Sequence, residues 1–318
     1  MSESPLRLDA LDLDIYRELY RGSTRAPGGV DPRLNATRIA HRLKVGRARV
    51  AGRLRSWSRS GFLVRYDVWP NPALFGARTA WLNIQVDHPR HKPALIERLG
   101  MLEGAIWGLE FLGDWITLGV VGADGTAFER ARGLVRGLAG VAEVETPMLS
   151  REVEPSRALT PLDVRIVRAL RERPTATLSA TAQRVGVSTR TITRHYSELI
   201  DRSLVWFVPV LDFRAISYPV VAVTVEMRPG APSDGLARRI RARYPLAFDY
   251  GDTDPDAGGP GSTGFIVIPP SAAHLEELDR YIAGLDGVVR HETNVLVRMH
   301  SFPGWFDRQL RSGTERRA

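Results

Sequence analysis

The 318-residue sequence contains no cysteine, which excludes disulfides, thiolate metal sites and cysteine nucleophiles. This absence suits a reducing compartment, and we expect the protein to be cytoplasmic. No apolar run approaches the ~18 residues that a membrane-spanning helix needs, so no membrane association is expected. The first residues, MSESPLRLDALDLD, are polar and acidic and do not resemble a secretory signal. Lysine is almost absent as well, because Lys44 and Lys92 are the only two and arginine supplies the remaining cations.

Recognisable groups of catalytic or metal-binding residues are also missing from the sequence. The seven histidines are scattered along the chain, and no His-Glu-x-x-His pattern occurs. We therefore expect no metal, no cofactor and no catalytic residues, and we interpret the protein as a non-enzyme.

Positive charge, by contrast, is concentrated in two separate segments. Residues 1–66 have a net charge of +8 and residues 157–208 one of +5, whereas residues 67–156 carry −4 and residues 209–318 carry −1. A basic domain gains free energy by displacing the counterions condensed on nucleic acid. The two basic segments therefore indicate a nucleic-acid partner, and the alternative is an arginine-rich surface that contacts only solvent.

Three blocks of the sequence recur in the same order about 150 residues further on, which indicates an internal duplication. The matched blocks are Leu11–Ile15 with Leu162–Ile166, Ala40–Val45 with Ala182–Val187, and Gly140–Thr146 with Gly287–Thr293. The first copy carries an additional loop at residues 22–29, which is rich in glycine and proline. We predict four domains and a tail helix, with boundaries at 1–66, 67–156, 157–210, 211–300 and 301–318.

Each basic segment predicts three helices followed by a strand, the order of a winged helix-turn-helix domain. Helices are expected at 36–43 and 47–58 in the first copy and at 161–172, 178–185 and 189–200 in the second. In each third helix, apolar residues at helical spacing form a buried face, and an arginine-rich face remains on the outside. Such a helix fits the major groove of double-stranded DNA. The predicted DNA-binding residues are Arg47, Arg49, Arg53, Arg55, Ser56, Arg59, Ser188, Thr189, Arg190, Thr191, Arg194 and His195. Glu198 lies on the same face of the second copy and would repel phosphates.

The segments that follow the basic modules alternate strand and helix patterns in the order βαββαβ, which is the ferredoxin-like order. The hairpin of the first copy contains Gly113, Asp114 and Trp115, and we predict these three residues to bind a small-molecule effector. A glycine allows close approach of the backbone, the carboxylate would bind an ammonium group, and the indole offers an apolar wall. Amino acids or related amines are the favoured class, and a plain hairpin without ligand is the alternative. The hairpin of the second copy keeps Gly251-Asp252 but is lengthened by residues 253–263.

This arrangement resembles the leucine-responsive/asparagine regulator (Lrp/AsnC) family, present twice in one chain. The Leu-Asp openings at Leu11 and Leu162, the helix-turn-helix Ala182–Tyr196 and the hairpin Gly113–Ile116 carry the resemblance. The first copy departs from the family pattern, because Lys44 replaces a glycine and Gly46 a serine; the second copy has His195 where arginine is usual.

The resemblance implies a cytoplasmic transcriptional regulator that binds double-stranded DNA and responds to an amino acid or a similar effector. Members of the family dimerise by pairing the sheets of their α+β domains. We therefore predict an α+β fold, a tandem duplication in which the two ferredoxin-like modules form an intrachain pseudo-dimer, with further homo-oligomers left open.

Sirohaem decarboxylases, which are enzymes of haem biosynthesis, are similar to the same family and remain the alternative. They bind an anionic tetrapyrrole through arginine and histidine of the α+β domains. Their His-Asn-Tyr-x-Arg-like segment would fall near Trp107–Glu110 or Phe248–Tyr250, and neither stretch contains histidine or arginine. The regulator is therefore the favoured interpretation of the sequence.

Overall fold

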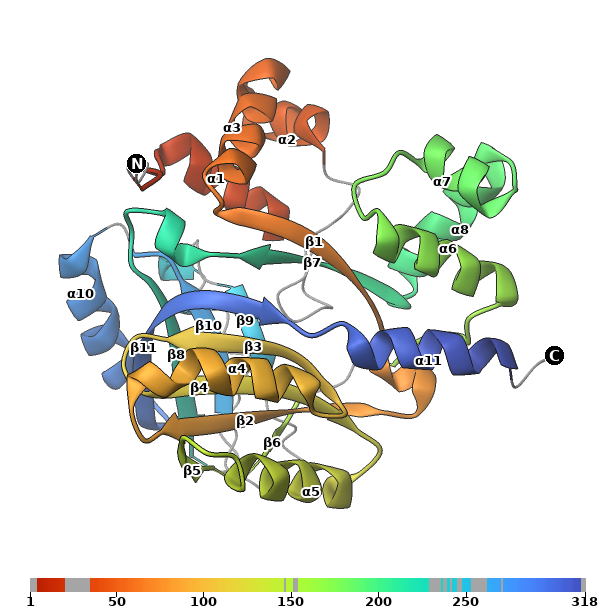
Figure 1. The fold of residues 1–318 in the computed structure, drawn as a ribbon. Coiled ribbons are helices and arrows are strands. Elements are labelled where there is room, and N and C mark those ends of the chain that lie inside the picture. Colours follow the sequence, from red (N-terminus) through yellow and green to blue (C-terminus); the bar gives the residue numbers. More distant parts are fainter. Residues whose placement is uncertain are drawn as a thin grey trace.

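The computed structural model describes residues 5–20, 35–145, 147–150, 154–228, 236, 239–240, 242–244, 248–252, 262–269 and 271–315. It has an α+β fold that is a tandem duplication of a winged helix-turn-helix module and a ferredoxin-like module. The helix-turn-helix modules form one layer, a two-stranded ribbon runs beneath them, and one long sheet with its helices forms the rest (Figure 1). The additional loop at 22–29 and residues 253–261 of the second hairpin lie outside the described residues, and the helix expected at 234–243 lies largely outside them.

The helices of the two helix-turn-helix modules begin and end within two residues of the expected positions. They are α1 (Ala10–Tyr20), α2 (Ala36–Leu43), α3 (Arg47–Arg59), α6 (Pro161–Glu172), α7 (Leu178–Val185) and α8 (Thr189–Asp201). Side chains cap their first turns: Asn35 accepts from the Thr37 and Arg38 amides, and Ser188 accepts from the Thr191 amide. Ser188 therefore caps α8, whereas Gly46 offers α3 no side-chain cap.

The turn between the second and third helix takes a left-handed backbone conformation in both copies. Gly186 has φ 75° and ψ 40° there, and Lys44 has φ 55° and ψ 39°. Glycine adopts this conformation freely, whereas a residue with a Cβ pays about 1–2 kcal/mol. The turn requirement therefore explains why the sequence pattern favours glycine, and Lys44 occupies the position under strain.

The strand that follows each helix-turn-helix module pairs with its counterpart from the other module. β1 (Leu63–Pro70) and β7 (Val205–Leu211) form an antiparallel ribbon in which Val68 faces Phe207 and Pro70 faces Val205. Both strands are longer than the wing strands predicted from sequence, which were expected at 62–66 and 205–208. The ribbon therefore joins the two copies before either chain segment enters its ferredoxin-like module.

The ferredoxin-like modules share one sheet, which has nine strands within the described part of the chain. The strand order is β5-β2-β4-β3-β11-β8-β10-β9, and β6 also pairs with β2. The strands are β2 (Arg78–Val86), β3 (Ala105–Phe111), β4 (Trp115–Gly122), β5 (Val141–Val144), β6 (Met148–Leu149), β8 (Val220–Met227), β9 (Phe248–Asp252), β10 (Ser262–Val267) and β11 (Val288–Ser301). Each half keeps the ferredoxin-like strand order, and the halves join where β3 pairs with β11. The prediction that the two modules pair within one chain is therefore confirmed.

Helices cover one face of the sheet, and the helix-turn-helix layer covers the other. α4 (Lys92–Met101) and α5 (Gly125–Arg136) enclose one apolar core, and α10 (Ala272–Ala283) helps to enclose a second. A third core lies between the sheet and the helix-turn-helix layer. In it Trp81 and Trp107 pack edge to face, with their ring centroids 4.4 Å apart. The tail helix α11 (Gly304–Glu315) contributes Trp305, Phe306 and Leu310 to this core. Short helical turns η1 (Pro72–Phe75), η2 (Pro89–His91) and η3 (Phe213–Ala215) connect the layers. Among the described helices, none combines the length and apolar character that a membrane span requires.

Replacing Lys44 with glycine is expected to stabilise the protein by about 0.5–1 kcal/mol, because the gain from relieving the left-handed strain exceeds the entropy that glycine loses. Replacing Gly186 with alanine at the equivalent turn is the matched control and should destabilise the protein by a similar amount. Chemical denaturation of both variants measures the two effects, and a loss of stability in Lys44→Gly contradicts this account of the turn.

Candidate nucleic-acid interface

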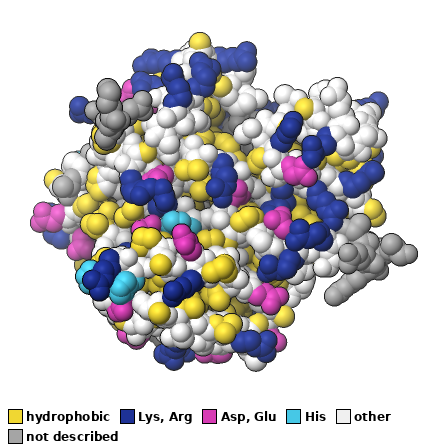
Figure 2. Space-filling model, viewed as in Figure 1, with side chains coloured by type: hydrophobic (Ala, Val, Ile, Leu, Met, Phe, Trp, Pro, Cys, Tyr) yellow, Lys and Arg dark blue, Asp and Glu magenta, His cyan; other side chains and the backbone are white. Residues whose placement is uncertain are grey.

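The recognition helix of the first copy, α3, presents a row of exposed arginines. The exposed residues are Arg47, Arg49, Arg55 and Arg59, and no ion pair or side-chain hydrogen bond joins them to other described residues. The apolar side chains Val50 and Trp57 are buried on the opposite face, as the sequence predicts. Figure 2 shows Lys and Arg side chains gathered over α2 and α3 at the top of the molecule. This face therefore has positive charge that the protein itself does not neutralise.

The preceding helix, α2, adds to this charge in a way that the sequence analysis missed. Arg38 is exposed on it, and Lys44 is exposed in the turn that follows. Arg42 is also exposed but is bound to the buried Glu18 at 3.2 Å. The signal for these residues was present in the sequence as the cations of the second helix, but the prediction considered only the third.

Arg53, predicted to read DNA, instead binds carboxylates of the first helix and its entry. It forms an ion pair with Asp9, and its Nη1 lies 3.3 Å from Oδ2 of Asp12. Asp12 is almost fully buried, and its other oxygen accepts a 2.9 Å hydrogen bond from Nε1 of Trp57. A buried carboxylate needs such partners, because burying an unpaired charge is costly. Arg53 therefore holds α3 against α1, and contact of its partly exposed side chain with DNA stays a prediction.

The equivalent position of the second copy carries the same interaction with a different residue. His195 was expected to face outward but is buried, and its Nδ1 donates a 2.7 Å hydrogen bond to the fully buried Asp163. Asp163 also accepts from Arg157 at 2.6 Å and from the Thr160 amide and hydroxyl at 2.8 and 2.7 Å. Burial by itself would raise the pKa of Asp163, but these hydrogen bonds outweigh it and hold the pKa at about 2. His195 therefore fixes α8 on α6, which corrects its expected place on the outward face.

The outward face of α8 is smaller and less charged than that of α3. Thr189, Arg190, Thr193 and Arg194 are exposed on it, and Thr193 was not among the predicted residues. Ser188 and Thr191 are engaged with each other, because their hydroxyl oxygens lie 2.9 Å apart. Ser56 of the first copy is partly buried.

Glu198 on α8 is neutralised by an arginine that the sequence analysis did not single out. Its Oε2 lies 3.1 Å from Nη2 of Arg157, the residue that also binds Asp163. The expected repulsion between Glu198 and phosphates is reduced by this contact. Arg157 precedes α6 by four residues, and no pattern in the sequence indicates that its side chain reaches α8.

The residues of the predicted effector hairpin, between β3 and β4, have structural contacts within the protein. Gly113 adopts φ 87°, and an added Cβ there would meet no atom within 4 Å. The carboxylate of Asp114 accepts a 2.9 Å hydrogen bond from Gln85, and Trp115 is partly buried against the main core. Gly113 is therefore required by the turn itself, and effector binding at these three residues stays a prediction.

A second polar group lies where the two halves of the sheet meet. His300 of β11 and Glu110 of β3 approach to 2.9 Å, and this hydrogen bond lowers the pKa of Glu110. Nearby, the buried Lys92 donates a 2.5 Å hydrogen bond to the Phe111 carbonyl, and burial lowers its pKa. Sequence analysis missed this group because His300 and Glu110 come from different copies. In the described part of the chain, no three His, Asp or Glu side chains group as metal ligands would.

The stability of the second module is expected to depend on pH through Asp163. Its folded pKa of about 2 is below the ordinary value of 3.8, so its contribution is present above pH 4 and lost as the pH falls toward 2. Asp163→Asn should therefore lower the free energy of unfolding by about 2 kcal/mol at pH 7, with the difference from the unsubstituted protein shrinking toward pH 2. Thermal unfolding between pH 2.5 and 7 measures this difference. An Asp163→Asn variant that is equally stable at pH 7 would show that the ion-pair group contributes nothing.

Comparison with known proteins supports a DNA-binding module and extends the fold likeness to the whole chain. Residues 159–205 match a family of winged helix-turn-helix DNA-binding domains. No curated protein matches the sequence. The crystal structure of the siroheme decarboxylase NirDL matches with a TM-score of 0.50 and 14% identity, over 95% of this chain and 99% of that chain. AsnC from E. coli matches with a TM-score of 0.31 and 15% identity, over 49% of this chain and 100% of that chain. An AsnC family regulator from Agrobacterium tumefaciens matches with a TM-score of 0.33 and 16% identity, over 49% and 98%.

The full-length match overturns one expectation from the sequence. The chain was interpreted as a non-enzyme, but a solved structure that covers 95% of it is that of an enzyme. The absence of a catalytic motif was therefore not a sufficient reason to exclude enzymatic activity. At 14% identity the likeness shows the tandem fold and does not specify a reaction.

Proposed function

We propose that the protein is a sequence-specific DNA-binding transcriptional regulator of the Lrp/AsnC type. The observation that carries this proposal is the winged helix-turn-helix match at residues 159–205, in a chain that contains the same module twice. The exposed arginines of α3 support it, because Arg47, Arg49, Arg55 and Arg59 are not used within the described structure. Arginine binds phosphates and the guanine edge, so such a row suits duplex DNA.

Within this proposal the two modules have unequal roles. α3 supplies the stronger electrostatic contact, and α8 supplies Thr189, Arg190 and Arg194. The ribbon of β1 and β7 keeps the two helices in one arrangement, so a single chain would contact both halves of an operator. An amino acid or similar effector would act by favouring one arrangement of the modules.

Arg49→Ala should weaken binding to duplex DNA by about 1–3 kcal/mol without changing the melting temperature, because Arg49 is exposed and contacts no other described side chain. Arg53→Ala should instead destabilise the protein by on the order of 1–3 kcal/mol, because it leaves the buried Asp12 with one partner fewer. Arg130→Ala on α5 is the matched control, since this exposed arginine lies in the ferredoxin-like layer.

The DNA for this comparison is selected by the unsubstituted protein from a random duplex pool, and affinity is measured between ~50 and ~200 mM salt. Binding of the unsubstituted protein should fall steeply over this range because phosphate contacts release counterions. Equal affinity of Arg49→Ala and Arg130→Ala for the selected duplex would contradict the placement of the interface on α3. Failure to enrich any sequence would contradict sequence-specific recognition.

A sirohaem decarboxylase-like activity is the second candidate, favoured by the full-length likeness to NirDL. A related structure of that enzyme holds an iron-uroporphyrin III analogue. β3 itself contains no histidine, but His300 of the paired strand β11 lies beside Glu110 of β3. Adding an iron-uroporphyrin to the protein and recording the visible spectrum tests this candidate. A saturable shift of the absorption band that is lost in His300→Ala would support tetrapyrrole binding, and an unchanged spectrum would count against it.

A further inference from the structure

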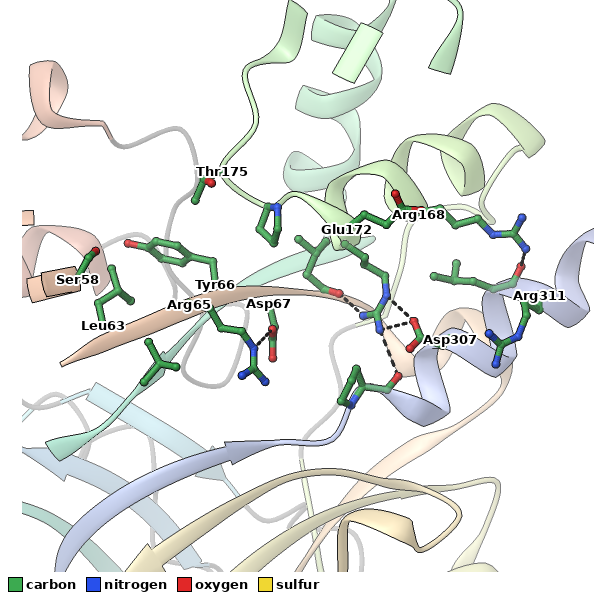
Figure 3. Close-up of a pocket in the computed structure, with 16 residues that line it drawn as sticks. Ser58, Leu63, Arg65, Tyr66, Asp67, Arg168, Glu172, Thr175, Asp307 and Arg311 are labelled. Atoms are coloured by element: carbon green, nitrogen blue, oxygen red, sulfur yellow. Dashed lines mark hydrogen bonds and ion pairs between the residues drawn. The ribbon is translucent and has the colours of Figure 1, made fainter. Parts of the chain in front are cut away.

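A cavity of about 850 Å³ opens between the two copies, away from the outward faces of α3 and α8 (Figure 3). One wall is β1 of the first copy, a second is the C-terminal part of α6 from the second copy, and the third is the tail helix α11. This volume is within the range of small-molecule sites. None of the predicted DNA-binding or effector residues lines it, so we treat it as a separate site.

Some of the charged residues in this cavity are already used to hold its walls together. Arg171 is largely buried and donates to Asp307 at 2.7 Å and to the carbonyls of Val68 and Pro303 at 2.5 and 3.2 Å. These contacts join α6, α11 and β1 at one point. Arg171 therefore fixes the shape of the cavity and has little capacity left for a ligand.

Other polar groups of the lining still have free capacity. Arg65 is half exposed and donates through Nε to Oδ1 of Asp67 at 2.9 Å, and no described residue bonds to its two terminal nitrogens. Arg311 is exposed at the far end of the cavity. The second oxygen of Asp67 is buried without a hydrogen-bond partner, which is costly unless a donor reaches it. The cavity thus offers the terminal nitrogens of Arg65 and the exposed Arg311 to an anionic ligand, whereas the second oxygen of Asp67 is enclosed by protein atoms.

The remaining wall is apolar. Val64 is 52% exposed although it is aliphatic, and the partly buried Tyr66 and Pro174 also line the cavity. Burial raises the pKa of Tyr66, so its ring stays neutral at physiological pH. An apolar body in contact with these residues would remove their surface from water.

We propose that this cavity binds a small carboxylic acid with an aromatic or branched apolar body. The carboxylate pairs with the terminal nitrogens of Arg65, which no described residue bonds. A monoanion suits the site better than a phosphate dianion, because the carboxylates of Asp67, Glu172 and Asp307 also line it.

Binding here would couple to DNA recognition, a step that rests on the proposed function. The ligand contacts β1, which follows α3, and α6, which carries α8 through the Asp163 group. A bound ligand favours the arrangement in which β1, α6 and α11 lie close together. This arrangement changes the relative position of the two recognition helices. The ligand therefore acts as an effector between the copies.

Calorimetric titration of the full chain tests the site with a panel of such acids, led by 4-hydroxyphenylacetate. 4-Hydroxyphenethyl alcohol lacks the carboxylate, and inorganic phosphate lacks the apolar body. We expect at least one acid of the panel to bind at least tenfold more tightly than its counterpart without the carboxylate and than phosphate. Absence of binding by every acid, or tighter binding of phosphate, overturns the proposal.

Two variants locate the binding. Val64→Glu places a negative charge in the cavity at a half-exposed position, and Val289→Glu makes the same change at a 61% exposed position of β11 outside the cavity. Val64→Glu should lower the affinity for the acid at least tenfold, and Val289→Glu should leave this affinity unchanged. Both variants should keep the melting temperature of the unsubstituted protein. Arg65→Gln should weaken binding by a similar factor. Equal affinities of the two glutamate variants overturn the assignment to this cavity.

The effect on DNA is measured separately, by adding the acid to the complex with the selected duplex. A changed affinity for DNA supports the coupling, and an unchanged affinity overturns the coupling while the titration still reports on the site. If the protein selects no DNA but binds the acid, the proposed function fails and the ligand site stands.

Discussion

The antiparallel pairing of β1 with β7 is the constraint on which the placement of both recognition helices depends. Each strand directly follows a helix-turn-helix module, so the register that sets Val68 opposite Phe207 also sets where α3 and α8 lie. Alone, either strand would expose unpaired backbone groups at an edge. Two copies in one chain satisfy one edge of each strand, because the tether gives each strand a partner at high effective concentration. In the long sheet, the antiparallel pairing of β3 with β11 likewise joins a strand of one copy to a strand of the other.

A buried aspartate on the first helix of each module imposes a second constraint. Asp12 and Asp163 occupy equivalent positions, and each accepts a hydrogen bond from a side chain of the recognition helix. The first copy supplies Arg53, and the second supplies His195 together with Arg157. The Leu-Asp motif that opens each copy is thus a device for orienting the third helix. Because the contact of Arg53 with Asp12 fixes this orientation, the other arginines of α3 are not needed for it and stay exposed.

The sequence predicts local structure well where periodicity and breakers coincide. The helices at 36–43, 161–172 and 178–185 begin and end at the predicted residues. The partner of a strand is a non-local property, which explains why β1 was expected as a wing of its own module and not as the partner of β7. Arg53 shows the same limit for side chains: helical spacing places it outward, and only the approach of Asp9 and Asp12 reveals its role.

The prediction that the chain is not an enzyme is contradicted by the likeness of 95% of the chain to a solved enzyme structure. It relied on the absence of recognisable catalytic groups along the sequence, and the alternative enzyme was disfavoured because stretches such as Trp107–Glu110 lack histidine and arginine. In the folded chain, strands from different copies meet, and His300 lies beside Glu110 although 190 residues separate them. A motif search along one segment cannot exclude a site that is assembled from two.

The duplicated modules differ on the surfaces proposed to contact DNA. α3 begins at an uncapped glycine and exposes four arginines, whereas α8 begins at a serine cap and exposes two arginines with two threonines. The interior equivalents, the buried aspartates and the left-handed turns, are retained. A symmetric homodimer presents two identical helices to DNA, and identical helices favour a palindromic site. Because the tandem chain fixes two different helices in one covalent order, its geometry suits an operator whose two halves differ in sequence. Phosphate contacts in such a complex would be weighted toward the half that α3 occupies, since the unneutralised charge is concentrated there.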